Sequence, residues 1–260
     1  MKKRFPLSEK ELHELYWSRK LSTHQIARLT GFSQRTVFNW MKRYVIKRRD
    51  KNESHCKRVN LDLSPTFSYI LGVCFGDGTV YKMWCKHLSR HRYEVALHVR
   101  NETFAESFKV ALETQGFKVR LYTYNGWWHV FANSKIFYRY FSTLTLNDLK
   151  SILESDELAK AFIRGFYESE GSYCLCYHKR WNYFNEILVI SNTNLGLLKL
   201  ILERIKRWGI EFHLYGPFPR RPGRPIYVLQ TARKELIGRF LKLVEPSIKY
   251  KPSSKRLGLG

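Results

Sequence analysis

Apolar and polar positions alternate along two stretches in the middle of the chain, residues 93–100 and 117–124. A period of two predicts β-strands with one buried face and one open face. Helices are predicted to follow over 103–115 and 135–143, with another strand over 127–132. One side of the strand at 117–124 is basic and aromatic, with Lys118, Arg120, Tyr122 and Tyr124. The pattern therefore predicts a sheet that has helices on one face only.

The same order of predicted elements occurs a second time. A separation of 93 positions joins Asp77 to Glu170, Asn101 to Asn194, and Gly116 to Gly209. The second copy predicts a helix over 195–208, strands over 210–215 and 226–231, and a closing helix over 234–244. An insertion rich in proline and arginine, 216–225, raises the separation to 99 positions between Phe141 and Phe240. Two homologous halves in one chain are therefore predicted.

Each half opens with an apolar helix that ends in an acid and a glycine. The first is Tyr69-Ile-Leu-Gly-Val-Cys-Phe-Gly-Asp77-Gly78, and the second is Phe162-Ile-Arg-Gly-Phe-Tyr-Glu-Ser-Glu170-Gly171. In both, two small residues stand four positions apart and share one helix face, so another helix can approach closely.

The ends of these helices suggest a cation site. We expect the final glycines to form left-handed C-terminal caps. A carboxylate is unfavourable at the negative end of a helix dipole, so Asp77 and Glu170 need a compensating charge. A bound divalent cation would supply it.

These two segments resemble the paired motifs of the LAGLIDADG homing endonucleases in their glycines and final acids. The resemblance implies an α+β fold of two pseudo-symmetric αββαββα halves, which form a saddle-shaped sheet around the two packed motif helices. It implies that Asp77 and Glu170 meet over DNA and that each half cuts one strand, leaving a short 3′ overhang. Phe75 stands where the family often has an earlier acid.

Hydrolysis of a phosphodiester needs an attacking water, neutralisation of charge on the phosphate and help for the leaving oxygen. Carboxylates that hold Mg²⁺ or Mn²⁺ supply all three. Asp77 and Glu170 are the expected catalytic metal ligands, and the carbonyls of Gly76 and Ser169 are expected to add ligands because helix ends leave carbonyls unpaired. Family enzymes also have basic residues near the metals. By register these would be Arg100, Lys135, Arg233 and Lys234, with Lys135 and Lys234 as the catalytic candidates.

Residues 1–46 show the start and stop signals of a small helical domain. Capping boxes begin at Ser8 and Ser22, and Gly31 lies in a turn before a third helix. The segment resembles a helix-turn-helix. Its recognition helix would present Gln34, Arg35, Thr36, Asn39, Lys42 and Arg43 to DNA. A plain three-helix bundle with a solvated basic face is the alternative.

The chain of 260 residues carries a net charge of +24, which favours a polyanionic partner. We expect double-stranded DNA with a long asymmetric site, and intron RNA is a further candidate. Besides the recognition helix, the expected DNA contacts are Lys82, His98, Arg100, Lys118, Arg120, Tyr122, Lys179, Arg221, Arg224 and Arg233. No apolar run is long enough to span a membrane, and the cysteine spacing suggests a reduced, intracellular protein. The resemblance to the two-motif enzymes implies a monomer.

The sequence therefore predicts a helix-turn-helix domain (1–46), a basic linker (47–63) and two LAGLIDADG-like halves (64–154 and 155–260). The predicted function is metal-dependent, site-specific cleavage of double-stranded DNA. The alternative is a binder of the same fold that does not cleave, either an RNA-splicing maturase or a transcription regulator. Retention of both motif acids favours cleavage.

Overall fold

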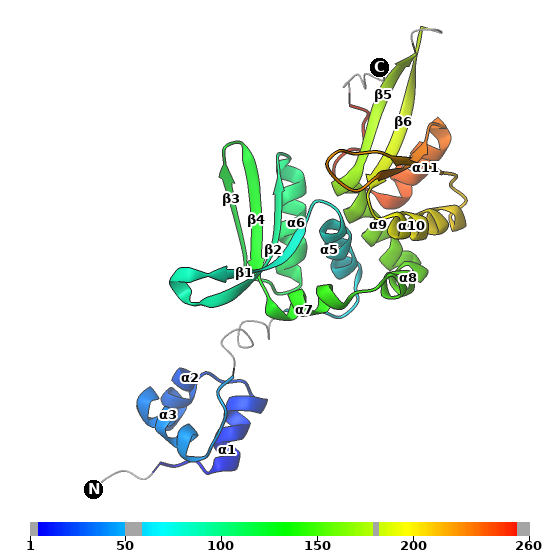
Figure 1. Cartoon of the computed structure of the whole chain (residues 1–260). Coiled ribbons are helices and arrows are strands. Elements are labelled where there is room, and N and C mark those ends of the chain that lie inside the picture. The colour runs from blue at the N-terminus through cyan, green and yellow to red at the C-terminus, as the bar shows by residue number, and fades with distance from the viewer. Residues whose placement is uncertain (1–4, 50–58, 179–181, 254–260) are drawn as a thin grey trace. The chain divides into compact units, whose positions relative to one another are not determined.

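The computed structural model describes residues 5–49, 59–178 and 182–253. The chain divides into two compact units, which we call the head (Met1–Lys57) and the body (Arg58–Gly260). Figure 1 shows both units. Among the described residues, no helix is long and apolar enough to cross a membrane.

The head is helical, as its capping signals predict. Ser8 and Glu11 form one capping box, and Ser22 and Gln25 form another. Gly31 adopts a left-handed conformation (φ 70°) between the second and third helices, which a residue with a side chain rarely adopts. The elements are α1 (Glu9–His13), η1 (Glu14–Ser18), α2 (Thr23–Thr30) and α3 (Gln34–Arg43), and their buried side chains include Leu12, Ile26, Val37 and Met41.

The body contains two halves with the same order of elements. In half 1 they are α5 (Pro65–Phe75), β1 (Thr79–Cys85), η2 (Lys86–Leu88), β2 (Arg90–Val99), α6 (Glu102–Thr114), β3 (Val119–Tyr124), β4 (Trp127–Asn133) and α7 (Lys135–Thr143). In half 2 they are α9 (Asp156–Glu170), β5 (Gly171–His178), β6 (Tyr183–Asn192), α10 (Leu195–Arg207), β7 (His213–Phe218), β8 (Ile226–Thr231) and α11 (Lys234–Val244). The antiparallel sheets have the orders β1-β2-β4-β3 and β5-β6-β8-β7. The predicted α+β fold is confirmed.

Two predicted details differ from the structure. Between the halves lies an unpredicted helix, α8 (Leu146–Glu154), which Thr145 caps and which buries Leu149 and Ile152. The strand predicted over 210–215 begins later, at His213, and continues to Phe218. Ile210 and Phe212 are fully buried in the core, so their apolar pattern reflects packing and not strand pairing.

The motif helices α5 and α9 lie directly against each other. A Cβ atom at Gly72 would collide with the carbonyl oxygen of Phe162, and one at Gly165 would collide with that of Tyr69. The small residues therefore permit backbone-to-backbone packing, as predicted.

The prediction of left-handed glycine caps is wrong. Gly76 has φ −104° and Gly171 has φ −79°, so neither is left-handed, and Gly78 is not among the positive-φ residues of the described chain. Space explains these glycines instead. A Cβ at Gly171 would enter the ring of Tyr167, and one at Gly78 would lie 2.9 Å from the Cα of Cys74.

Each sheet has helices on one face. In half 1, Val95 and Leu97 of β2 and Val130 of β4 are fully buried in the same core as Phe104 and Phe108 of α6. The alternate positions on these strands form the opposite, open face. One continuous core joins both halves through α5 and α9, so the two sheets belong to one packed unit.

Candidate metal and nucleic-acid site

The two motif acids meet at the ends of the paired helices. Asp77 follows α5 in a turn, and Glu170 is the last residue of α9. A Cβ built at Gly76, next to Asp77, would collide with the side chain of Ser169 and lie 3.1 Å from the Cγ of Glu170. The close packing of α5 and α9 therefore brings both carboxylates to one place.

The electrostatics of this place favour a cation. Partial burial raises the pKa of Glu170 to about 7, with a further contribution from the negative charge of Asp77. Burial also raises the pKa of Asp77. Both carboxylates are destabilised in their charged forms, which a bound cation would reverse.

Asn192, at the end of β6, orients one of the acids. Its Nδ2 donates to Oε1 of Glu170 at 2.9 Å, and its Oδ1 accepts from the backbone N–H of Asn194 at 2.8 Å. This second bond fixes the amide so that the NH₂ group faces Glu170. In half 1 the equivalent position, 93 residues earlier, is Val99, which cannot donate. The sequence analysis did not identify Asn192.

Lys249 is a second residue that the sequence analysis missed. Its Nζ donates to the carbonyl oxygens of Glu168 and Ser169, each at 2.7 Å, at the C-terminal end of α9. Burial lowers the pKa of Lys249, while Asp77 and Glu170 act in the opposite direction. Its backbone is left-handed (φ 60°), which is uncommon for a residue with a side chain and typical of functional sites.

The ammonium of Lys249 changes both the charge of the site and the set of groups that can bind a metal there. It supplies positive charge to the site, and it occupies the Ser169 carbonyl that was expected to bind metal. No local sequence signal marks this lysine, because it lies in an irregular segment after α11, far in sequence from both acids.

Glu168, beside the site, anchors this segment. The carboxylate is fully buried and accepts from Tyr69 Oη (2.6 Å), Arg164 Nε (3.1 Å), and the backbone N–H and hydroxyl of Ser247 (2.6 and 2.9 Å). We call residues 247–253 the C-terminal strap. At its other end, the Ser253 N–H donates to the carbonyl of Tyr173 on β5 at 2.8 Å. Lys249 is thus held between two anchored points.

The donor set of Asp77 and Glu170 fits Mg²⁺ or Mn²⁺. Mg²⁺ is usually held by one or two carboxylates, with water and substrate phosphate completing its shell. Within the ranges that the structure describes, no group of three or more His, Cys, Asp or Glu side chains could hold a metal ion. The site therefore suits an ion that shares its coordination with a phosphate.

The structure does not bring the two nominated lysines to the acids. Asn192, which contacts Glu170, pairs with Tyr227 at the start of β8, whereas Lys234 follows the end of that strand. Lys135 likewise follows the end of β4, and its Nζ lies 5.9 Å from the ring centre of Tyr93 on the helix side of the sheet. Lys135 and Lys234 therefore lie beyond the ends of β4 and β8 that are away from the acids.

The open face of the first sheet carries most of the expected contacts. The rings of His98 and His129 lie 4.5 Å apart, and Tyr122 stacks on His129 at 5.0 Å. Arg120 lies over Phe131, and Arg100 lies 4.9 Å from the ring centre of Trp127. Lys118, just before β3, is exposed. This face is a continuous aromatic and basic surface.

Other predicted contacts are distributed differently. Lys82 pairs in register with Tyr93, so it lies on the opposite face from Glu94 and the open surface. Lys179 lies outside the described residues. Arg221 and Arg224 are exposed between β7 and β8, and Arg233 is 3.1 Å from Glu211 in an ion pair.

The second sheet has an open-face hollow that the sequence analysis missed. It has a volume of about 210 Å³, and its lining includes His213, Tyr215, Gln230 and Arg233. His213 lies opposite Gln230 in the pairing of β7 with β8. The alternation within the strand predicted over 210–215 already puts His213 and Tyr215 on the face opposite to Ile210 and Phe212, and this signal could have identified them.

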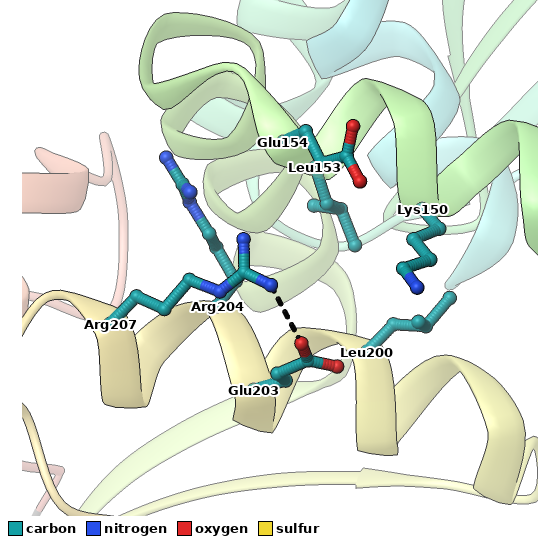
Figure 2. A pocket seen from close by; sticks show the side chains of 7 residues that line it. All are labelled: Lys150, Leu153, Glu154, Leu200, Glu203, Arg204 and Arg207. Carbon is teal, nitrogen blue, oxygen red and sulfur yellow. Dashed lines mark hydrogen bonds and ion pairs between the residues drawn. The ribbon is translucent and has the colours of Figure 1, made fainter.

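A smaller hollow between α8 and α10 is no ligand site. Figure 2 shows its lining, in which Arg207 pairs with Glu203 at 2.7 Å. Its volume of about 20 Å³ holds roughly one water molecule.

The recognition helix of the head exposes only part of its predicted set. Arg35, Asn39, Lys42 and Arg43 are exposed. Gln34 and Thr36 are half-buried: Gln34 donates to the Thr23 hydroxyl at 2.9 Å, and the Thr36 hydroxyl is 2.9 Å from that of Ser33. These two side chains therefore hold α3 in place within the head.

Comparison with known proteins covers both units. A family model described as a homeodomain-like domain matches residues 14–52. An uncharacterized protein of Methanocaldococcus jannaschii is 33% identical over 166 residues, covering 61% of this chain and 60% of that protein. A second uncharacterized protein of the same organism is 28% identical over 234 residues, with 87% and 82% coverage. The chain thus spans about 60% of the first relative's length.

Solved structures resemble the body. The homing endonuclease I-DmoI in complex with DNA and Mn has a TM-score of 0.51 and 24% identity, covering 69% of this chain and 96% of that chain. Full-length DUF199/WhiA from Thermatoga maritima has a TM-score of 0.50 and 15% identity, covering 78% and 64%. These likenesses concern the fold. The body of this chain therefore has the LAGLIDADG fold of these proteins, and the head before it is homeodomain-like.

Proposed function

We propose that the protein is a site-specific endonuclease that cleaves both strands of DNA with a divalent metal ion. The observation that carries this proposal is the meeting of Asp77 and Glu170 at the ends of α5 and α9, with the pKa of both carboxyls raised. Two destabilised carboxylates at a solvent-accessible helix junction have no evident structural purpose. They have a clear one if a metal and a phosphate complete the site.

Each residue around the acids has a definite task in this proposal. Asp77 and Glu170 would hold the metal, and Asn192 keeps the Glu170 carboxylate oriented. Bound Mg²⁺ would stabilise charge on the phosphate and activate water. The Lys249 ammonium, fixed on the α9 carbonyls, adds positive charge beside the scissile phosphate.

DNA would lie across the open sheet faces, with phosphates on Arg100, Lys118 and Arg120 and bases against the aromatic rings. Exposed residues of α3 in the head would add contacts to base edges in the major groove. I-DmoI structures contain DNA together with Mn or Ca. By analogy, we propose that this chain binds duplex DNA as a monomer with Mg²⁺ or Mn²⁺.

The test is cleavage of a randomised duplex library by the full chain in Mg²⁺, followed by sequencing of the cut ends. We expect one enriched site, cuts in both strands, and no cutting in EDTA. The variants Asp77→Asn and Glu170→Gln should bind that site without cutting it. Wild-type cutting by either variant would contradict the assignment of the acids.

A binder that does not cleave, either a maturase or a transcription regulator, is the second candidate. It is favoured by one observation, the occupation of the Ser169 carbonyl by Lys249, which leaves the metal fewer protein ligands. Selection of bound rather than cut duplexes from the same library distinguishes the two. Enrichment by binding with no cut ends in Mg²⁺ or Mn²⁺ would support the binder.

A further inference from the structure

Gln230 stands at the centre of the open face of the second sheet. Its neighbours across the sheet are Val189 on β6 and His213 on β7, and Val228 lies two positions earlier on β8. Leu229, the residue before it, is fully buried in the core, so Gln230 points to the opposite, open face. The side chain is half-buried and lines the hollow of about 210 Å³ on this face.

The amide of Gln230 is left without a partner. No hydrogen bond joins it to another residue in the ranges that the structure describes. Val189 and Val228 offer it neither a donor nor an acceptor. An amide carries both kinds of group, and leaving them unpaired in a half-buried place costs free energy. A ligand that presents one acceptor and one donor side by side would satisfy both ends of the amide.

The equivalent place in the first sheet is chemically different. Phe131 stands there in place of Gln230, and His129 in place of Val228, each 99 positions earlier and in the same register with the outer strand. The ring of Phe131 lies 5.8 Å from the guanidinium carbon of Arg120. All of these positions are described in both halves. At this place, the first sheet therefore offers rings and a cation, and the second an amide between valines.

We propose that Gln230 recognises an A·T base pair in the half of the target under the second sheet, with Val189 and Val228 against the thymine methyl group. This inference rests on the proposal that duplex DNA lies across the open faces, and it does not depend on cleavage. In the major groove, adenine presents the N7 acceptor beside the N6 amino donor, which match the NH₂ and the oxygen of a glutamine amide. The thymine of the same pair presents its methyl group in the same groove.

A G·C pair does not fit this place. Guanine presents two acceptors, N7 and O6, so the oxygen of the Gln230 amide would face an acceptor. The pair also has no methyl group for the valines. His213, on the other side of Gln230, does not choose between the purines, because its ring has an N–H donor in either tautomer and both purines present N7. The choice of base therefore falls to the amide.

The test selects duplexes that bind the full chain from a randomised library in EDTA, so that cutting cannot remove them. The wild-type protein should enrich a site with an A·T pair at one position, and Gln230→Ala should lower the preference for A·T over G·C there about 5- to 150-fold. Gln230→Arg should change that preference to guanine, since a guanidinium presents only donors. Because the amide has no described partner, both variants should keep the wild-type melting temperature within a few degrees.

Deoxyuridine tests the valines separately, because it pairs with adenine as thymine does but lacks the methyl group. Its substitution for that thymine should weaken binding by the wild-type protein about fourfold, as expected for one buried methyl group. The double variant Val189→Ala, Val228→Ala should lose less affinity on the same substitution. Equal losses in the two proteins would overturn the methyl contact.

Phe131→Ala is the matched control, since it changes the equivalent place in half 1. It should weaken binding, because a ring is lost from the duplex surface, without changing the base preference at the Gln230 position. Glu203→Ala on α10 should leave both properties unchanged. An enriched site whose A·T preference survives Gln230→Ala, or falls equally in Phe131→Ala, would overturn this inference alone. Failure to enrich any site would instead contradict the proposed function, and this inference with it.

Discussion

The two halves of the body share one frame but surround their motif acids differently. In half 1 the position two residues before the acid is Phe75, whose ring lies 5.0 Å from that of Phe141 and 6.0 Å from that of Phe162. In half 2 the same position is Glu168, which is buried and accepts hydrogen bonds from Tyr69, Arg164 and Ser247.

The difference extends to the acids themselves. Glu170 has a fixed donor in Asn192, whereas the equivalent residue in half 1 is Val99. Lys249 comes from the strap of half 2 and sits on the end of α9. Duplication therefore explains the backbone symmetry, while the polar network that supports the site belongs to one half. We expect the site to be asymmetric in its response to substitution.

The largest expected effect is on cleavage. Asp77→Asn and Glu170→Gln should each lower the cleavage rate by about 10²–10³-fold or more, as for loss of a group that stabilises transition-state charge. Single-turnover assays that follow each strand separately provide the measurement. Both variants should be more stable than wild type without metal, because each removes one of two repelling charges. Lower melting temperatures in EDTA would contradict this electrostatic account.

The next effect concerns stability. Glu168→Ala should lower the free energy of unfolding by about 3 kcal/mol, because buried donors from α5, α9 and the strap lose their acceptor. Phe75→Glu should cost a similar amount, since its surroundings are aromatic rings that offer no donor. Denaturant titration measures both. Glu203→Ala, at an exposed ion pair, is the control and should stay within about 0.5 kcal/mol.

A smaller effect is expected at Lys249. Lys249→Met removes a positive charge beside the acids and frees the Ser169 carbonyl, so Mn²⁺ should bind more tightly. A gain of about 1–2 kcal/mol, or roughly 5- to 30-fold in affinity, is expected for a partly solvated charge pair. Titration calorimetry without DNA measures it, and Lys242→Met on α11 is the control. Weaker binding in Lys249→Met would mean that the lysine organises the ligands more than it repels the metal.

The smallest expected effect tests the hydrogen bond from Asn192 to Glu170, which has no equivalent in half 1. Asn192→Leu should weaken Mn²⁺ binding by about 1 kcal/mol, the usual value of one hydrogen bond. Val99→Leu makes the matched change in half 1 and should leave affinity unchanged. Equal losses in the two variants would show that packing at the strand ends, and not the amide, sets the metal affinity.

Local patterns were sufficient for most of the fold. The period-two alternation of 93–100 and 117–124, the separation of 93 positions between the halves, and the capping boxes of the head all depend on neighbours in sequence, and the structure confirms them. Local periodicity did not predict that β7 begins only at His213, because Ile210 and Phe212 continue the apolar alternation although they are buried in the core and lie outside the strand.

The sequence by itself determined the two motif helices, the duplicated sheets, the head and the pair Asp77 and Glu170, because each has a short-range signal. Only the tertiary structure decided that the strap brings Lys249 to α9, that Asn192 faces Glu170, and that Lys82 and Lys135 lie with Tyr93 on the helix side. Lys249 is 80 residues from the Ser169 carbonyl that it contacts. Such contacts depend on how the strands pair and how the chain returns after α11, and no spacing within one segment encodes them.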